Sequence, residues 1–162
     1  MQRATWARER ESRLWERRAA VYEEALTSVK RGQCFRAEAL VTGRLPEARE
    51  RRSREVEADV VLAQLEIYGP AELIAAHVKT ARAMQTWAAA FSAWQEQAAL
   101  GRGPRPAPTD PLWPEVVRRD DEARAVEQEF TRVVRSDVHA DGPGRLRRRR
   151  TPVWHRRTGG SG

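Results

Sequence analysis

Metal binding is the first chemistry to test, because Asp137, His139 and Asp141 alternate along the chain as possible ligands. Familiar metal sites on helices need ligands at matched spacings on paired segments, such as Glu-x-x-His on two neighbouring helices. The chain has 3 histidines, and His77 and His155 lie far from His139 in the sequence. We therefore expect no metal site and no cofactor, and we interpret His77 as a residue at the boundary of an apolar helix stripe.

The single cysteine, Cys34, is the second candidate for chemistry, as a nucleophile. A reactive thiol needs a base or another activating group nearby, and Cys34 lies on a helical stretch beside Phe35 with no neighbouring histidine or acid. We expect a packed thiol in a reducing cytoplasm, because one cysteine cannot form an internal disulfide. The sequence also has no glycine-rich phosphate loop and no Gly-x-Ser-x-Gly elbow, so we expect a protein that is not an enzyme.

A run of arginines near the C-terminus carries the net charge of +7. Residues 143–162 contain seven arginines and no acidic residue, so the rest of the chain is neutral overall. Polyanions are the natural partners of such a segment, and contacts from every arginine to DNA would give a salt slope of about −6. The candidate polyanion-binding residues are Arg145, Arg147, Arg148, Arg149, Arg150, Trp154, Arg156 and Arg157.

Three interpretations of this tail stay open. The first is a disordered, solvated segment with incidental affinity for anions, and the second is nucleic-acid binding. The third is reversible contact with an anionic membrane surface, where each arginine would contribute ~1 kcal/mol and Trp154 would be one interfacial anchor. The sequence ends Gly159-Gly160-Ser161-Gly162, which resembles a flexible linker, so whether this end is native also stays open.

Aromatic residues are the candidates for a partner interface. Trp87, Phe91 and Trp94 follow one another at helical spacing, and Trp6 and Trp15 lie near the start of the chain. An aromatic stripe at helical spacing usually packs in a core, whereas the same rings on an open face mark a binding surface. The burial of these rings therefore decides between a self-sufficient domain and an interaction surface.

Long amphipathic helices must position these residues. Apolar residues at spacings of three, four and seven predict a first helix over residues 3–31, with a kink or short break at Gly32 and an end at Gly43. A second helix is predicted from about Pro46 to Tyr68, with its later half buried on a broad face. The residues expected on that face are Val56, Val60, Ala63 and Ile67, with Val61, Leu65 and Tyr68 beside them.

The second half of the chain predicts two further helices. A turn at Gly69-Pro70 should open a third helix that runs to about Leu100, carries the most apolar stripe and lies centrally. A proline-rich linker, residues 101–114, overlaps two alternative starts for a fourth helix that reaches about Asp137. The starts are Asp110-Pro111 and Trp113-Pro114, and the ion pairs Arg118–Glu122 and Asp120–Arg124 are expected on the outside of this helix.

These patterns predict an all-α fold, an elongated antiparallel bundle of three to four long helices in a domain of residues 1–142, followed by the disordered tail 143–162. No apolar stretch approaches the ~20 residues that a membrane helix needs, and no signal peptide opens the chain, so we expect a soluble cytoplasmic protein. The function that we expect is a non-enzymatic interaction or scaffold protein that docks a partner helix, as in a coiled coil, or self-associates. The alternative is a nucleic-acid-associated protein that uses the tail as an electrostatic tether.

Three segments resemble a loose group of uncharacterised helical proteins of high-GC Gram-positive bacteria. They are residues 6–26 (WARERESRLWERRAAVYEEAL), residues 67–73 (IYGPAEL) and residues 122–137. The resemblance implies two long antiparallel helices joined by a mid-chain turn, and it implies no activity and no binding residue. In that group a membrane segment often precedes the first helix, but this chain begins at Met1 directly inside the helix, so membrane anchoring is not carried over.

Overall fold

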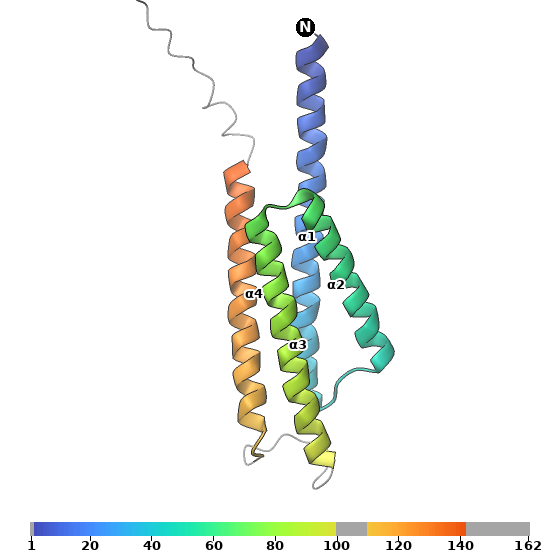
Figure 1. Cartoon of the computed structure of the whole chain (residues 1–162), viewed down its shortest axis with the longest axis vertical. Coiled ribbons are helices and arrows are strands. Elements are labelled where there is room, and N and C mark those ends of the chain that lie inside the picture. The colour runs from blue at the N-terminus through green and yellow to red at the C-terminus, as the bar shows by residue number, and fades with distance from the viewer. Residues whose placement is uncertain (1, 100–109, 142–162) are drawn as a thin grey trace, which may run out of the picture.

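The computed structural model describes residues 2–99 and 110–141, which form four helices and no strand. The helices are α1 (Gln2–Thr42), α2 (Ala48–Tyr68), α3 (Ala71–Ala99) and α4 (Trp113–Asp141). They run alternately in opposite directions along an elongated bundle (Figure 1), which confirms the predicted all-α antiparallel fold. The predicted tail and residues 101–109 of the predicted linker lie outside the described residues.

The first helix is longer and more regular than predicted. The short break considered at Gly32 is absent, because α1 continues through this residue. A glycine inside a helix costs only about 1 kcal/mol relative to alanine, which packing on both sides of Gly32 outweighs. The predicted end of α1 is confirmed at Gly43, whose φ of 69° is the left-handed conformation that closes a helix.

The turn between α2 and α3 lies at Gly69-Pro70, as predicted. Glycine is needed there for a different reason than at Gly43, where the backbone has a positive φ. Gly69 is extended, with φ of −95° and ψ of 159°, and its N–H donates to the Leu65 carbonyl at 2.7 Å. A Cβ atom at Gly69 would lie 2.8 Å from that carbonyl oxygen. The close approach of backbone to backbone therefore requires glycine at this position.

Two apolar clusters form the core. Along α3 and α4 the core positions are spaced alternately by four and three residues, which is the spacing of long helices packed side by side. The first cluster joins all four helices and contains Val21, Tyr22, Ala25, Val61, Leu65, Leu73, Ala76, Phe130 and Val134. The second joins α1, α3 and α4 and contains Phe35, Ala39, Trp87, Phe91, Trp94 and Val116.

Three of the aromatic residues proposed as a partner interface lie inside the second cluster. Trp87, Phe91 and Trp94 are 0%, 0% and 1% exposed, so the interface hypothesis is wrong for these three residues. Their rings form a continuous chain of contacts, with centroids 5.1 Å apart between Trp87 and Phe91 and 5.2 Å apart between Phe91 and Trp94. The central position predicted for α3 is thereby explained by aromatic packing.

The broad buried face predicted for α2 is wrong. Val56, Val60 and Ile67 are 57%, 48% and 72% exposed, whereas Val61 and Leu65 are buried. The helix diverges from α1 toward its own start (Figure 1), so that a narrow stripe of its later half reaches the core. Apolar residues on more than one side of α2 made the stripe ambiguous in the sequence.

Candidate functional site: an open groove along α1

The start of α1 projects beyond the other helices at the end of the bundle where α2 meets α3 (Figure 1). Arg17 donates to the hydroxyl of Tyr68, the last residue of α2, at 3.2 Å, and Arg18 contacts Asp137, four residues before the end of α4, at 3.5 Å. Trp6 and residues 9–17 are all exposed. At 1.5 Å per residue, the segment from residue 2 to residue 17 is about 24 Å long.

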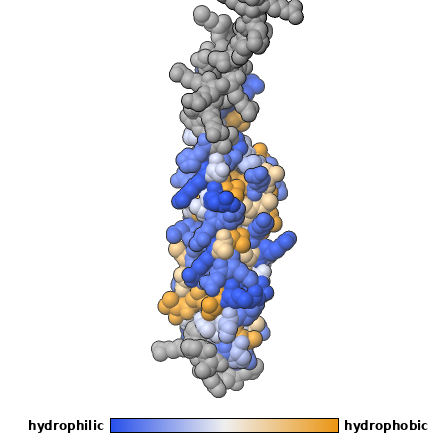
Figure 2. Space-filling model, turned by 90° about the vertical axis from the view of Figure 1, so that its left-hand side faces the viewer, coloured by the Kyte–Doolittle hydropathy of each residue, from blue (hydrophilic) through white to orange (hydrophobic). Residues whose placement is uncertain are grey.

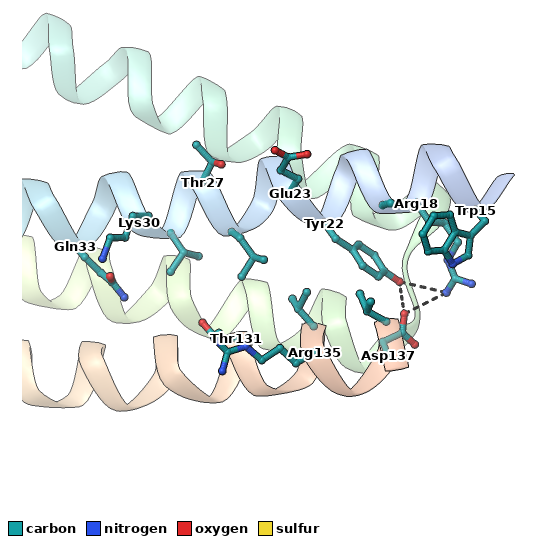
Figure 3. A pocket seen from close by; sticks show the side chains of 15 residues that line it. Trp15, Arg18, Tyr22, Glu23, Thr27, Lys30, Gln33, Thr131, Arg135 and Asp137 are labelled. Carbon is teal, nitrogen blue, oxygen red and sulfur yellow. Dashed lines mark hydrogen bonds and ion pairs between the residues drawn. The ribbon is translucent and has the colours of Figure 1, made fainter. Parts of the chain in front are cut away.

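Below this projection, α1 and α4 leave an open groove of about 650 Å³ between them (Figure 3). Trp15 and Asp137 lie near one end of the groove and Gln33 lies toward the other. The apolar side chains that line it come from both helices and are Trp15, Tyr22, Leu26, Val29, Val134 and Val138. The charged residues of its lining also come from both helices and are Arg18, Glu23, Lys30, Arg135 and Asp137. An apolar groove with a charged rim is suited to an amphipathic partner.

A polar contact closes the upper end of the groove. The Tyr22 hydroxyl donates to the Asp137 carboxylate, and Arg18 donates to the Tyr22 hydroxyl at 3.2 Å (Figure 3). Burial, together with the hydrogen bond to Asp137, raises the pKa of Tyr22 to about 12. The phenol therefore stays protonated at physiological pH and remains a donor that ties α1 to α4.

Two apolar residues of α1 near the end of the bundle are exposed, although the residues seven positions later are buried. Leu14 and Trp15 precede the buried Val21 and Tyr22 by seven residues, and residues seven apart lie on the same face of a helix. Leu14 and Trp15 nevertheless are 52% and 42% exposed, and Trp6 is 69% exposed. Trp6 and Trp15, unlike the three rings in the core, are therefore available for the predicted partner interface.

Sequence reasoning missed a buried ion cluster that lies between the two apolar clusters. Arg36 is 2% exposed, and its Nε donates to Asp120 at 2.9 Å while its Nη2 donates to Glu127 at 2.8 Å. The expected pair of Asp120 with Arg124 exists at 2.6 Å, but the prediction that it decorates the outside is wrong for Asp120, which is 4% exposed. The cluster fixes α1 against α4 at one level of the bundle.

The charge of Arg36 is secured by these contacts. Burial by itself lowers the pKa of the guanidinium, and the hydrogen bonds to Glu127 and Asp120 more than reverse this, so the pKa lies above its ordinary value. The sequence spacing of Asp120 and Glu127 indicated that both acids are buried. Asp120 and Glu127 are seven residues apart and in phase with the buried Val116 and Ala123, which places both carboxylates at core positions of α4.

The sequence predicted His77 at the boundary of its helix stripe, but the residue is buried. Its side chain is 4% exposed and its ring packs edge-on against Phe130, with centroids 5.8 Å apart. Burial lowers the pKa of His77, so the ring is neutral near neutral pH. His77 lines a cavity of about 120 Å³ together with Thr80, Met84 and Glu127.

Two further candidates from the sequence do not gather into a site. Cys34 is exposed on α1, so the expectation of a packed thiol is wrong. In the described ranges 2–99 and 110–141, no three His, Cys, Asp or Glu side chains come together as possible metal ligands. Asp137 is engaged by Tyr22 and His139 is exposed. Within the same ranges, no helix combines the length and apolar character needed to cross a bilayer.

The outer surface of α4 is polar. Figure 2 shows a largely hydrophilic face on this side of the molecule, with apolar side chains gathered in smaller patches. Exposed ion pairs such as Arg118 with Glu122, expected from the sequence, and Arg132 with Glu129 at 2.6 Å contribute to it. This face offers little apolar area, so the groove between α1 and α4 and the projecting part of α1 are the better candidates for binding.

Comparisons of the chain with protein-family models, with curated proteins and with solved structures find no match. The function is therefore inferred from the residues of the chain itself, and the resemblance to helical proteins of high-GC Gram-positive bacteria stays a prediction.

Proposed function

We propose that the protein is a non-enzymatic interaction or scaffold protein that takes an amphipathic helix into the groove between α1 and α4. The observation that carries this proposal is the open apolar groove between α1 and α4, at whose end Trp15 is 42% exposed, with Leu14 52% exposed beside it. Large apolar side chains held in water on a folded scaffold are typical of surfaces that are covered by a partner.

The shape of the groove favours a helix as the occupant. On α1 the groove extends from Trp15 to Gln33, which at 1.5 Å per residue is about 27 Å. That is the length of a helix of about 18 residues, enough to present four or five anchors at positions three and four apart. The charged rim around Glu23, Lys30 and Arg135 can pair with the polar sides of the same helix.

A photo-cross-linking amino acid introduced at Thr27, an exposed residue that lines the groove, tests this proposal in cells. We expect discrete adducts whose cross-linked peptide, identified by mass spectrometry, belongs to an amphipathic helix. The matched control is the same amino acid at Arg132, which is exposed on the outer face of α4 and should give no such adduct. Absence of adducts at Thr27, or equal labelling at both positions, would overturn the proposal.

Binding to nucleic acid through the tail is the second candidate function. Its support is that α4 ends at Asp141 at the same end of the bundle from which α1 projects (Figure 1), and residues 2–18 of α1 contain six arginines against three glutamates. Basic residues from both ends of the chain would then face one polyanion. Deletion of residues 143–162 should abolish salt-sensitive retention on DNA, with a salt slope near −6 in the full chain, and unchanged retention would exclude the tether.

A reducing compartment such as the cytoplasm is the location that we propose. The support is the exposed thiol of Cys34, because a single exposed cysteine in an oxidising compartment would be prone to intermolecular disulfides. Labelling the protein with a thiol reagent immediately after cell lysis checks this, with a free Cys34 as the expected result. A mixed disulfide at Cys34 would contradict it.

A further inference from the structure

We infer that two copies of this chain pair antiparallel, so that the projecting start of α1 of each copy lies along an exposed, acidic face of α2 of the other. The twofold axis passes near Arg17, where the end of α2 contacts α1. This inference goes beyond the proposed function, because it uses a different side of α1 from the one that lines the groove with α4. It follows from the face of α1 that α2 covers, from an exposed stripe of α2 and from the charges of both.

The face of α1 that is turned to α2 continues onto the projecting segment. Arg17 reaches Tyr68 at 3.2 Å and Arg31 reaches Glu57 at 3.1 Å, so these two arginines mark the side of α1 on which α2 lies. Residues four, seven and eleven positions apart share one face of a helix. Above the end of α2 this face therefore carries the exposed residues Arg13, Arg10 and Trp6, which precede Arg17 by four, seven and eleven positions.

α2 has an exposed apolar stripe on the side away from the core. Its members are spaced by four, three and four residues, and they are Val56, Val60, Ala63 and Ile67. The side chains of Val56, Val60 and Ile67 are 57%, 48% and 72% exposed. This spacing is that of a helix packed along a second helix. The stripe is about 17 Å long, so the projecting residues 2–17 of α1, which extend over about 24 Å, are long enough to cover it.

The charges of the two surfaces are opposite. Residues 55–78 contain five acidic residues and no lysine or arginine, although 30 of the 162 residues of the chain are basic. Three of these acids line one flank of the stripe, because each directly precedes one of its members, and they are Glu55, Asp59 and Glu66. The projecting segment presents Arg10 and Arg13 beside Trp6. Within residues 2–99 and 110–141, no ion pair engages Asp59, Glu66, Arg10 or Arg13.

A twofold axis near Arg17, perpendicular to α1, brings these surfaces together. It places α2 of the second copy end to end with α2 of the first, on the part of the same face of α1 that its own α2 leaves uncovered (Figure 1). Since Tyr68 is level with Arg17 and Glu57 is level with Arg31, the stripe of one copy is level with residues 2–16 of the other. Glu66 then lies within one helical turn of Arg13 of the second copy, and Asp59 lies within one turn of its Trp6.

Reciprocity distinguishes a second copy from other occupants of these surfaces. A foreign basic helix on α2 would leave Trp6 uncovered, and a polyanion on the arginines would leave the stripe of α2 uncovered. In the pair the two surfaces cover each other, and the contact occurs twice by symmetry. Because α2 lies between the two α1 helices, Arg10 and Arg13 of one copy are opposed by the acids of α2 rather than by the arginines of the other α1.

Sedimentation equilibrium of the full chain, from low to high micromolar concentration, gives the first test. We expect twice the mass of the chain at high concentration and the single mass at every concentration for Ile67→Arg. Because Ile67 is 72% exposed and lies outside the core, this variant should keep its helical circular-dichroism spectrum. The matched control is Val41→Arg at the other end of α1, where the side chain is 84% exposed and the dimer should persist. A single mass for the wild type at all concentrations, or masses above twice that of the chain, would overturn the inference.

An exchange of opposite charges tests which surfaces meet. Arg13→Glu and Glu66→Arg should each weaken the pair about tenfold, because an attraction becomes a repulsion and the change occurs twice by symmetry. The double variant restores an opposite-charge pair and should recover most of the wild-type affinity. A double variant that associates no more tightly than the two single variants would contradict the pairing of α1 with α2.

The distance between two copies of Cys34 gives the third test. With spin labels on this exposed thiol, the antiparallel pair predicts a separation of about 50 Å, since the two sites lie on opposite sides of the axis. A label moved to Glu16→Cys in a Cys34→Ser background lies next to the axis and predicts a separation below about 30 Å. Short distances at both sites, or long distances at both, are incompatible with this arrangement. A monomeric chain that still cross-links through Thr27 to another protein would overturn the inference and leave the proposed function standing.

Discussion

Replacing Arg36 by methionine should be among the most destabilising single changes in the protein. Arg36 neutralises two buried carboxylates, and it does so through its Nε to Asp120 at 2.9 Å and through a forked contact to Glu127, with Nη2 at 2.8 Å. After the change Asp120 keeps Arg124 at 2.6 Å, whereas no second cation contacts Glu127 in the described part of the chain. The variant therefore leaves a carboxylate buried and unpaired.

The expected loss is about 3–5 kcal/mol of unfolding free energy, the usual cost of removing one partner from a buried ion pair. With a urea dependence of about 2 kcal/mol per molar, typical for a small protein, the midpoint of unfolding should fall by about 2 M. Urea titration followed by tryptophan fluorescence and circular dichroism measures this. The matched control is Arg31→Met, whose pair with Glu57 is 3.1 Å long between side chains 63% and 49% exposed and should contribute less than ~1 kcal/mol.

A combined variant separates the buried charge from the loss of packing. Changing Arg36→Met, Asp120→Leu and Glu127→Met together removes the charges and keeps a similar volume, so most of the loss should be recovered. A loss of less than ~1 kcal/mol for Arg36→Met alone would refute the reasoning. So would a combined variant that is less stable than the single one.

Further predictions concern the helices, the core and pH. Gly32→Ala should raise the unfolding free energy by about 1 kcal/mol, because α1 is continuous there and a methyl group meets no atom within 4 Å. Gly69→Ala should instead lower it by ~1–3 kcal/mol, because the Cβ would press on the Leu65 carbonyl, and urea titration of both variants checks the two signs. Trp87→Ala should cost ~3–5 kcal/mol, whereas Trp6→Ala should change the stability of the dilute chain by less than ~0.5 kcal/mol, as thermal unfolding would measure. Burial lowers the pKa of His77 below its unfolded value of 6.5, so the unfolded chain binds a proton that the folded chain does not. The unfolding free energy should therefore fall as the pH drops below that value. The urea midpoint should decrease between about pH 7 and pH 5, and it should decrease less in His77→Leu.

Periodicity predicted the parts of the fold that local physics determines. The stripe predicted for α3 is confirmed at Leu73, Trp87, Phe91 and Trp94, because large apolar residues recur there at helical spacing on one face, whereas Val78, also expected on it, is 37% exposed. Gly43 ended α1 as expected, since few other residues adopt a positive φ. In α2, by contrast, Val60 and Val61 lie on different sides of the helix, and the side that is buried depends on how α2 packs against α1.

The ion cluster of Arg36, Asp120 and Glu127 could not be recognised from the sequence because arginine is so abundant in this chain. With 28 arginines among 30 basic residues, one more arginine in an amphipathic helix gives no signal, and Arg36 lies beside Phe35 on the face that turns inward. The two acids were detectable, because Asp120 and Glu127 keep step with Val116 and Ala123 along α4. Their phase with the apolar stripe, rather than their distance from the nearest arginine, was the informative observation.

The open groove could not be predicted from the sequence, because it depends on the relative lengths and tilts of helices. The pattern of Leu14 and Trp15 is the same as that of Val21 and Tyr22, yet one pair is exposed and the other buried. The difference arises because α2 ends at Tyr68, which contacts Arg17, and α1 continues beyond that level. The level along α1 at which a neighbouring helix ends depends on how the four helices pack together.

Amide hydrogen exchange along α1, measured at several protein concentrations, tests the central claim most directly. Residues 9–17 are exposed in one chain, so their amides should exchange quickly in dilute protein and become protected at high concentration, together with residues 55–68 of α2. Amides in α3 near Trp87 should be protected equally at both concentrations. Fast exchange in residues 9–17 at every concentration would contradict self-association through this part of α1.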